Sequence, residues 1–120
     1  MVNTTAFLNT VKTGVRATVI AEGTYMAVGT DNTTPAVSDT TLGAEEERNS
    51  RQEYTEGTSD IVLSLFVNST EANSTSLKEV GVFDASSSGN MAMRDIFTAI
   101  AKTSSIEVWI DVEQQIDVTQ

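Results

Sequence analysis

Carboxylates are the main side chains in this sequence that could carry out acid–base or metal chemistry. The 120-residue chain has 17 Asp and Glu residues but neither His nor Cys, so it lacks the commonest general base, the commonest transition-metal ligand and any thiolate. Asp60, Asp84, Asp95 and Asp111 are candidates by type alone, because no spacing brings two of them onto one predicted rigid site. We therefore predict no catalytic residue and do not expect an enzyme.

The segment 31–39 contains oxygen-bearing side chains that could bind a cation. Asp31, Asn32 and Asp39 are suitable calcium ligands by type, but their spacing does not match the loop D-x-[DN]-x-[DN]-G with Glu at position 12. The glycines are scattered and form no phosphate-binding loop, and no Ser stands in a G-x-S-x-G motif. The sequence thus predicts no metal site and no cofactor.

The acidic balance of the chain restricts its partners. Lys and Arg number 7 against 17 acidic residues, which gives a net charge of −10. Phosphate binding requires clustered Lys and Arg, so neither nucleic acid nor an anionic membrane surface is an expected partner. No apolar run approaches the 18 residues of a membrane-spanning segment. An acidic, Lys-poor surface is typical of proteins from high-salt habitats and also of ordinary acidic proteins, and both alternatives stay open.

Helical periodicity is clearest near the N-terminus. Apolar residues spaced by three, four and four positions predict a helix over residues 5–21 that is capped within 3–5 and ends at Gly23; they are Leu8, Val11, Val15 and Val19. A second, short helix is predicted over 42–48, where three successive glutamates would lie near its N-terminal end. Between them, the polar segment 31–43 with the only proline is expected to be a surface loop.

Alternating apolar residues predict a set of strands. The expected strands span 25–30, 61–67, 77–84, 91–97 and 106–112, with an irregular strand and turn at 49–60, a hairpin loop at 85–90 and a connection at 98–105. Ile116 and Val118 keep the parity of the last strand, so a continuation to the end of the chain is the alternative for it. The residues expected to face the core are Ile61, Leu63, Leu65 and Val67 in one strand and Ile106, Val108, Ile110 and Val112 in the last. We predict a mainly β fold, an antiparallel β-sandwich-like single domain over 1–120 with one N-terminal amphipathic helix; an α+β fold is the nearest alternative.

Several apolar residues are singled out by their positions in these strands. Trp109 alternates away from the core face, and burial within the monomer, for example against the first helix, is favoured over a subunit contact. Met91 and Met93 are interpreted as adaptable packing residues. Gly81, inside a strand, predicts a bulge or the close approach of another backbone.

Three groups of residues in this chain are informative as an ordered set. They are Thr34-Pro35-Ala36, Asp39-Thr40, Leu42 and Glu45, then Glu79-Val80-Gly81-Val82-Phe83-Asp84, then Lys102-Thr103-Ser104. Their order resembles a small virion-protein domain of tailed phages and related archaeal viruses, which carries TAP-x-x-x-DT-x-L-x-x-E, then E-[VI]-G-[VLI]-F-D, then K-T-x-x. The resemblance covers about residues 5–118.

This resemblance implies a structural function in the virion. The expected role is an oligomeric component of the tail fibre, collar or baseplate, or of a capsid-surface turret or decoration. The expected partners are further copies of the chain and other virion proteins, and any contact with a host surface would be indirect. Candidate subunit-interface residues are Pro35, Val82, Phe83, Met91, Met93 and Trp109. The alternative is a free-standing module that binds a surface glycan or receptor.

Overall fold

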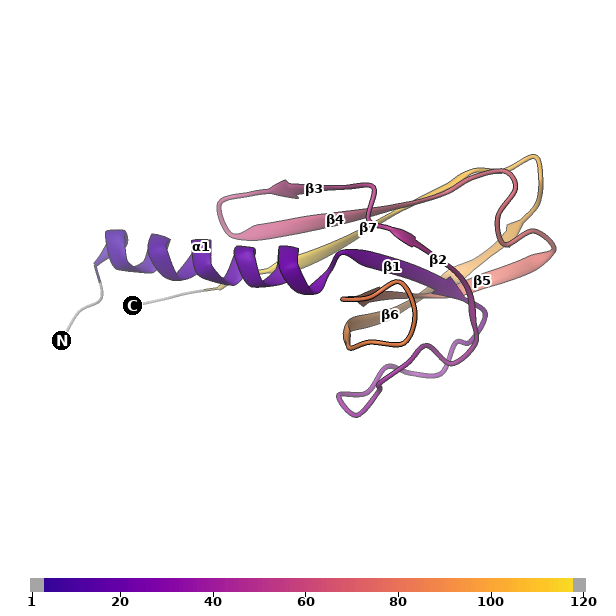
Figure 1. The fold of residues 1–120 in the computed structure, drawn as a ribbon, viewed down its shortest axis with the longest axis horizontal. Coiled ribbons are helices and arrows are strands. Elements are labelled where there is room, and N and C mark those ends of the chain that lie inside the picture. The colour runs from indigo at the N-terminus through magenta and orange to yellow at the C-terminus, as the bar shows by residue number, and fades with distance from the viewer. Residues whose placement is uncertain (1–3, 118–120) are drawn as a thin grey trace.

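The computed structural model describes residues 4–117, which form one helix and seven strands (Figure 1). In chain order the elements are α1 (Thr5–Glu22), β1 (Tyr25–Gly29), β2 (Glu45–Ser50), β3 (Glu53–Glu56), β4 (Asp60–Val67), β5 (Thr75–Phe83), β6 (Met91–Lys102) and β7 (Val108–Gln115). The fold is therefore mainly β with one N-terminal helix, as the sequence predicts. Among the described residues, no helix has the length and apolar character to cross a membrane.

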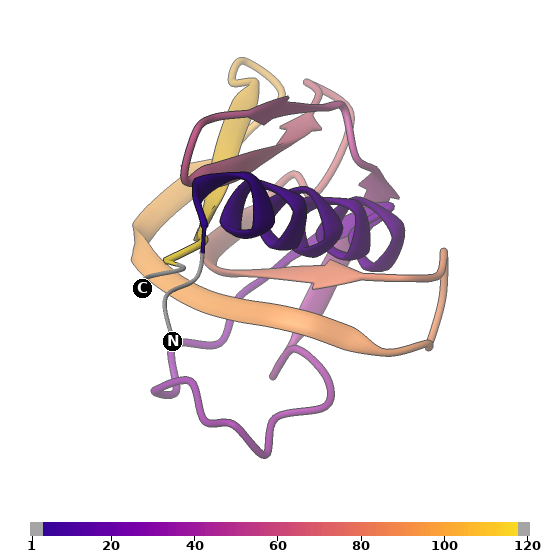
Figure 2. The ribbon, with the colours of Figure 1, turned by 90° about the vertical axis from the view of Figure 1, so that its left-hand side faces the viewer.

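The strands form two antiparallel sheets that pack face to face. One sheet has the order β2-β1-β5-β6 and the other β3-β4-β7. Figure 2 looks along the long axis of the molecule, with orange β6 below and yellow β7 above. The core between the sheets contains Met26, Val28, Val80 and Val82 from the first sheet and Ile61, Leu63, Leu65 and Val67 from the second. The predicted core face of β4 is thereby confirmed.

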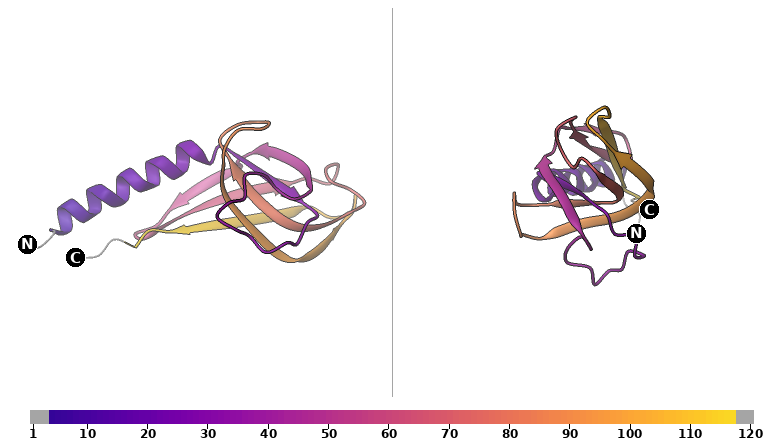
Figure 3. Two further views of the ribbon diagram at one scale, coloured as in Figure 1. Left: turned by 90° about the horizontal axis from the view of Figure 1, so that it is seen from below. Right: turned by 90° about the vertical axis from the view of Figure 1, so that its right-hand side faces the viewer.

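Helix α1 extends from one end of the sandwich. Thr4 caps it by accepting a hydrogen bond from the Phe7 amide at 3.2 Å, and Gly23 ends it. Gly23 is required because a Cβ there would lie 2.8 Å from Leu63 Cδ1. None of the 18 helix residues is buried. Figures 1 and 3 show α1 running alongside the ends of β4 and β7, and the molecule measures 56 × 28 × 25 Å.

Two sequence-based predictions of secondary structure are wrong. Residues 45–50 form β2 rather than a helix, because their backbone pairs with β1 from Tyr25↔Ser50 to Gly29↔Glu45. This pairing outweighs a weak local helix preference, and an edge strand tolerates glutamates that point to water. Residues 98–102 continue β6 instead of forming a connection, because Thr75 pairs with Lys102.

The last strand begins later than its alternation predicts. Val108 is buried, and Ile110 and Val112 are half-buried against the core, in agreement with the predicted face. Ile106 is 38% exposed because it lies in the turn closed by the bond from its amide to the Thr103 carbonyl. Strand β7 therefore supplies a shorter core face than expected.

Candidate functional site

The loop 30–44 covers the outer face of the four-stranded sheet. We call this outer face the closed face. In β5, Val80 and Val82 point into the sandwich, whereas Glu79, Gly81 and Phe83 point to the closed face. All five residues are buried. Burial on both sides of one strand requires a layer over each face of the sheet, so the loop acts as the second layer over β5.

Glu79, on β5 of the sheet beneath the loop, holds that loop in place. Its carboxylate is fully buried and accepts hydrogen bonds from the amides of Asp31 at 3.0 Å, Gly43 at 2.9 Å and Ala44 at 2.9 Å. The same carboxylate accepts a bond at 3.0 Å from Nε of Arg94 on β6. Both ends of the loop are thus fixed to one side chain of β5, and the buried charge is compensated by hydrogen bonds and by a guanidinium.

Arg94 completes a buried ion cluster with three carboxylates. Its side chain is 4% exposed and bonds Glu79, Asp31 at 3.2 Å and Asp39 at 3.1 Å, while Nη1 also donates to the Thr33 carbonyl at 3.0 Å. Burial alone would lower the pKa of Arg94, but the bonds to and charges of Glu79 and Asp39 outweigh it and raise the pKa. The two aspartates considered as calcium ligands therefore have an arginine as their partner.

A cross-strand row explains why the loop fits closely. Arg48, Ala27, Gly81 and Arg94 are direct neighbours across β2, β1, β5 and β6. The two small residues in the middle leave space that Leu42 of the loop fills, because a Cβ on Gly81 would lie 2.8 Å from Leu42 Cδ2. The close approach predicted at Gly81 is therefore by a side chain and not by another backbone.

Phe83 and Asp84 fix the neighbouring hairpin. The guanidinium of Arg48 lies 3.6 Å from the centre of the Phe83 ring and donates bonds of 2.9 Å to the carbonyls of Ala85 and Ser88. Asp84 accepts a 2.7 Å bond from the Asn90 amide. The residues of the E-V-G-V-F-D segment thus hold the loop and the hairpin onto the sheet.

Lys102, from the third segment of the resemblance, also has a role inside the fold. Its side chain is fully buried, and Nζ donates to Asn73 Oδ1 at 2.8 Å and to the Thr103 carbonyl at 3.0 Å. These bonds fix the turn before β5 against the end of β6.

The outer face of the three-stranded sheet is different, and we call it the open face. It carries Glu53 and Thr55 of β3, Val62, Ser64 and Phe66 of β4, and Trp109, Asp111 and Glu113 of β7. Trp109 is 50% exposed and its ring centre lies 5.8 Å from that of Phe66. Asp111 accepts bonds from Trp109 Nε1 at 2.9 Å and from Ser64 Oγ at 2.7 Å. The predicted burial of Trp109 against α1 is wrong, because α1 lies at the end of the sandwich.

The free edges of the two sheets are poorly suited to the addition of another strand. Carboxylates lie along β2, β3 and β7, three of the four edge strands in the described sheets. On the fourth, β6, two register shifts interrupt the pairing with β5. Charges and bulges on an edge hinder pairing with another chain. Contacts with a partner are therefore expected through side chains.

A groove of about 670 Å³ lies between β6 and β7, with Phe97, Ile100 and Ile110 in its wall.

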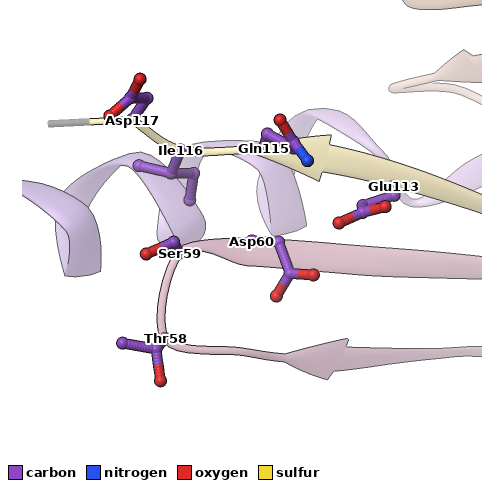
Figure 4. Close-up of a pocket in the computed structure, with 7 residues that line it drawn as sticks. All are labelled: Thr58, Ser59, Asp60, Glu113, Gln115, Ile116 and Asp117. Carbon is purple, nitrogen blue, oxygen red and sulfur yellow. The ribbon is translucent and has the colours of Figure 1, made fainter.

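A smaller pocket of about 370 Å³ lies where β4 begins and β7 ends (Figure 4). Asp60 and Glu113 stand on these neighbouring strands. A hydrogen bond with Asp60, together with burial and the charge of Asp60, raises the pKa of Glu113. Within residues 4–117, no group of three His, Cys, Asp or Glu side chains is placed to hold a metal ion. Asp60 and Glu113 therefore form a pair of neighbouring carboxylates in this pocket.

The six candidate interface residues fall into three groups. Val82 and Phe83 are 0% and 1% exposed inside the fold, so they cannot form a surface contact, and the prediction for them is wrong. Pro35, Met91 and Met93 are half-buried, the two methionines against the core clusters. Trp109 alone is exposed.

Arg94 and Phe66, the partner of Trp109, were not predicted as functional residues from the sequence. The signal for Arg94 was the single cation within the predicted strand 91–97, and the signal for Phe66 was its outward position in an apolar strand.

Comparison with known proteins does not assign the chain to a family. It matches no protein-family model and no curated protein.

Proposed function

We propose that this chain is a structural protein of a tailed-virus virion and works as a homo-oligomer. Its place is the tail fibre, collar or baseplate, or a turret or decoration on the capsid surface. Its partners are further copies of itself and other virion proteins.

The observation that carries this proposal is the closed face. The segments that resemble the virion module are far apart in the chain, yet Asp39, Leu42, Glu79 and Gly81 all meet there. Their side chains hold a loop on a sheet by hydrogen bonds, ion pairs and packing. Such contacts stiffen a surface, which is a property that a repeated building block needs. The same residues provide no group positioned to react with a substrate.

The test of this proposal is the presence of the chain in assembled particles. Mass spectrometry of purified virions of the virus that encodes it should detect the chain in many copies per particle. Sedimentation of the purified protein at micromolar concentration should show an oligomer, either alone or after addition of other virion proteins. Absence from particles combined with a monomer under both conditions would contradict the proposal.

A second candidate function, glycan binding, is favoured by the open face. A half-exposed Trp109 beside Phe66, with the Asp111 carboxylate adjacent, provides an aromatic surface and a hydrogen-bond acceptor. Because Trp109 is the only tryptophan, its fluorescence reports directly on this surface. Titration with a panel of neutral oligosaccharides decides the question. A saturable change that is lost in a Trp109→Phe variant would favour the binding module, and an unchanged spectrum would favour the structural protein.

A further inference from the structure

We propose that α1 of one copy docks on the open face of the next copy, so that the subunits associate head to tail. This inference rests on the proposed homo-oligomer and names the two surfaces that meet in it. Three observations carry it: the exposure of α1, the composition of the open face, and the distribution of positive charge in the chain.

Helix α1 contributes little to the core of its own subunit. Only Val19 and Ile20 of the helix pack against the core cluster, and Phe7 and Val15 are 55% and 38% exposed. Gly14 lies inside the helix and has no atom within 4 Å of the position of a Cβ. A glycine inside a helix weakens it, and here the glycine leaves room for another surface to approach. The exposed stripe formed by Phe7 and Val15, with the half-buried Val11 between them, therefore suits a partner.

The open face has the complementary character. Phe66 and the half-exposed Trp109 form an apolar patch near one end of this face, and the carboxylates of Asp111, Glu53 and Glu113 follow along the strands from that patch. Two such faces would repel each other, because like charges would meet across the contact. An apolar helix that carries cations would instead satisfy both parts of the face, since cations also bind aromatic rings.

The cations of this chain are available mainly on α1. Four of the seven are bound inside the fold: Arg48 and Arg94 on the closed face, Arg51 at the carbonyls of Ile20 and Gly23, and Lys102 at Asn73. Lys78 lies on β5. Among residues 4–117, the hydrogen-bond partners of Lys12 and Arg16 of α1 are neutral groups, the Ser59 hydroxyl at 3.4 Å and the Gly57 carbonyl at 3.3 Å. Lys12 lies three residues before Val15 and so borders the exposed stripe.

The dimensions of the two surfaces agree. A helix of 18 residues is about 27 Å long, and a strand of 8 residues such as β7 is about 26 Å long. A contact between two different surfaces is heterologous, and it generates a closed ring or an open filament according to the rotation between subunits. Both forms occur among repeated protein assemblies.

Single-cysteine variants test the contact, because the chain has no cysteine of its own. Thr18→Cys lies on the stripe side of α1, and Thr55→Cys lies on the open face. The two variants are mixed as full chains at a concentration where the wild type sediments as an oligomer, and are treated with a short bis-maleimide. We expect the mixed Thr18–Thr55 cross-link to be the main product, identified by mass after labelling one variant with ¹⁵N.

Thr13→Cys is the matched control, because it is also an exposed threonine of α1 but points to the opposite side of the helix. It should give at most about a tenth of the mixed product. A majority of Thr18–Thr18 or Thr55–Thr55 product would overturn the head-to-tail contact while leaving the homo-oligomer intact. A wild-type chain that stays monomeric, alone and with virion proteins, would overturn the contact together with the oligomer.

A charge exchange gives an independent test. Lys12→Glu should raise the dissociation constant about tenfold, since one attraction is lost and one repulsion is gained. Glu113→Lys alone should have a similar effect, and the double variant should recover to within about threefold of the wild type. Losses that simply add in the double variant would contradict a contact between Lys12 and this part of the open face.

Discussion

The two sheets of this protein bury their inner faces in the same way but treat their outer faces differently. On the closed face, Glu79, Gly81 and Phe83 are buried beneath a loop that is held by Arg94. In the other sheet, the buried or half-buried residues of β7 alternate with exposed residues that point to the open face, and Trp109 among them is 50% exposed. Many antiparallel sheets have one solvent-exposed face, but a solvent-exposed face that carries an aromatic pair is a candidate contact surface. The comparison separates the part of the molecule that maintains the fold from the part available to a partner.

The largest expected difference concerns the carboxylates of the two faces. Glu79→Ala removes the acceptor of four hydrogen bonds and leaves Arg94 buried without its closest carboxylate, so we expect a loss of about 3–5 kcal/mol of unfolding free energy. Glu53→Ala, on the open face, should change it by less than about 0.5 kcal/mol. Urea denaturation followed by circular dichroism measures both. Equal losses at the two positions would remove the distinction between the faces.

Aromatic residues give a second contrast of nearly the same size. Phe83 is 1% exposed and lies under Arg48, so Phe83→Ala should cost about 3–5 kcal/mol. Trp109→Ala should cost only about 1 kcal/mol, because the ring is half exposed and loses mainly its contact with Phe66. The same denaturation experiment compares the two variants. A larger loss for Trp109→Ala would show that the open face is part of the core.

Two glycines should respond to alanine with opposite signs. Gly81→Ala places a methyl group 2.8 Å from Leu42 and Phe83 atoms, so we expect a loss of about 1–3 kcal/mol. Gly14→Ala meets open space in a helix, so we expect a gain of about 0.4–1 kcal/mol. Thermal unfolding of the two variants decides the signs. Combining Gly81→Ala with Leu42→Ala tests the cause, because the combined loss should be smaller than the sum of the single losses.

The smallest expected effect is a pH-dependent change in melting temperature, caused by the Asp60–Glu113 pair at the edge of the open face. The pKa of Glu113 is raised in the folded state, so the folded state disfavours the charged form of this side chain. At pH 7 this lowers the free energy of unfolding, and the loss is relieved as the pH falls through the raised pKa. Asp60→Asn should therefore raise the melting temperature at pH 7, and the gain should shrink as the pH is lowered. Glu107→Gln removes a negative charge from the exposed residue directly before β7 and serves as the control. A pH-independent gain shared by both variants would indicate general charge repulsion.

The sequence was sufficient to predict those features that depend on neighbouring residues. The spacing of Leu8, Val11 and Val15 predicted α1, and the alternation from Ile61 to Val67 predicted the core face of β4. Strand β2 was missed because its glutamates resemble the start of a helix, and only its pairing with β1 makes it a strand. The conformational preference of a short segment does not indicate which distant strand it pairs with.

The candidate surfaces were harder to predict for a related reason. Arg94 meets Asp31 across 63 positions of the chain and Glu79 across 15, and no local pattern links these residues. The outward direction of Trp109 was correctly predicted, but its environment depends on which layer covers the sheet. Helix α1 was expected to provide that layer and instead extends past the end of the sandwich, so Trp109 remains exposed.

The anchor at Glu79 has a consequence for the order of folding. The loop can be fixed only after β5 and β6 have paired, because Glu79 and Arg94 stand on different strands and each binds loop residues distant in the chain. Contacts that form after the rate-limiting step influence mainly the rate of unfolding. We therefore expect the ion cluster to slow unfolding. Removing it should raise the unfolding rate, and so shorten the lifetime of the native state, while the refolding rate stays nearly unchanged.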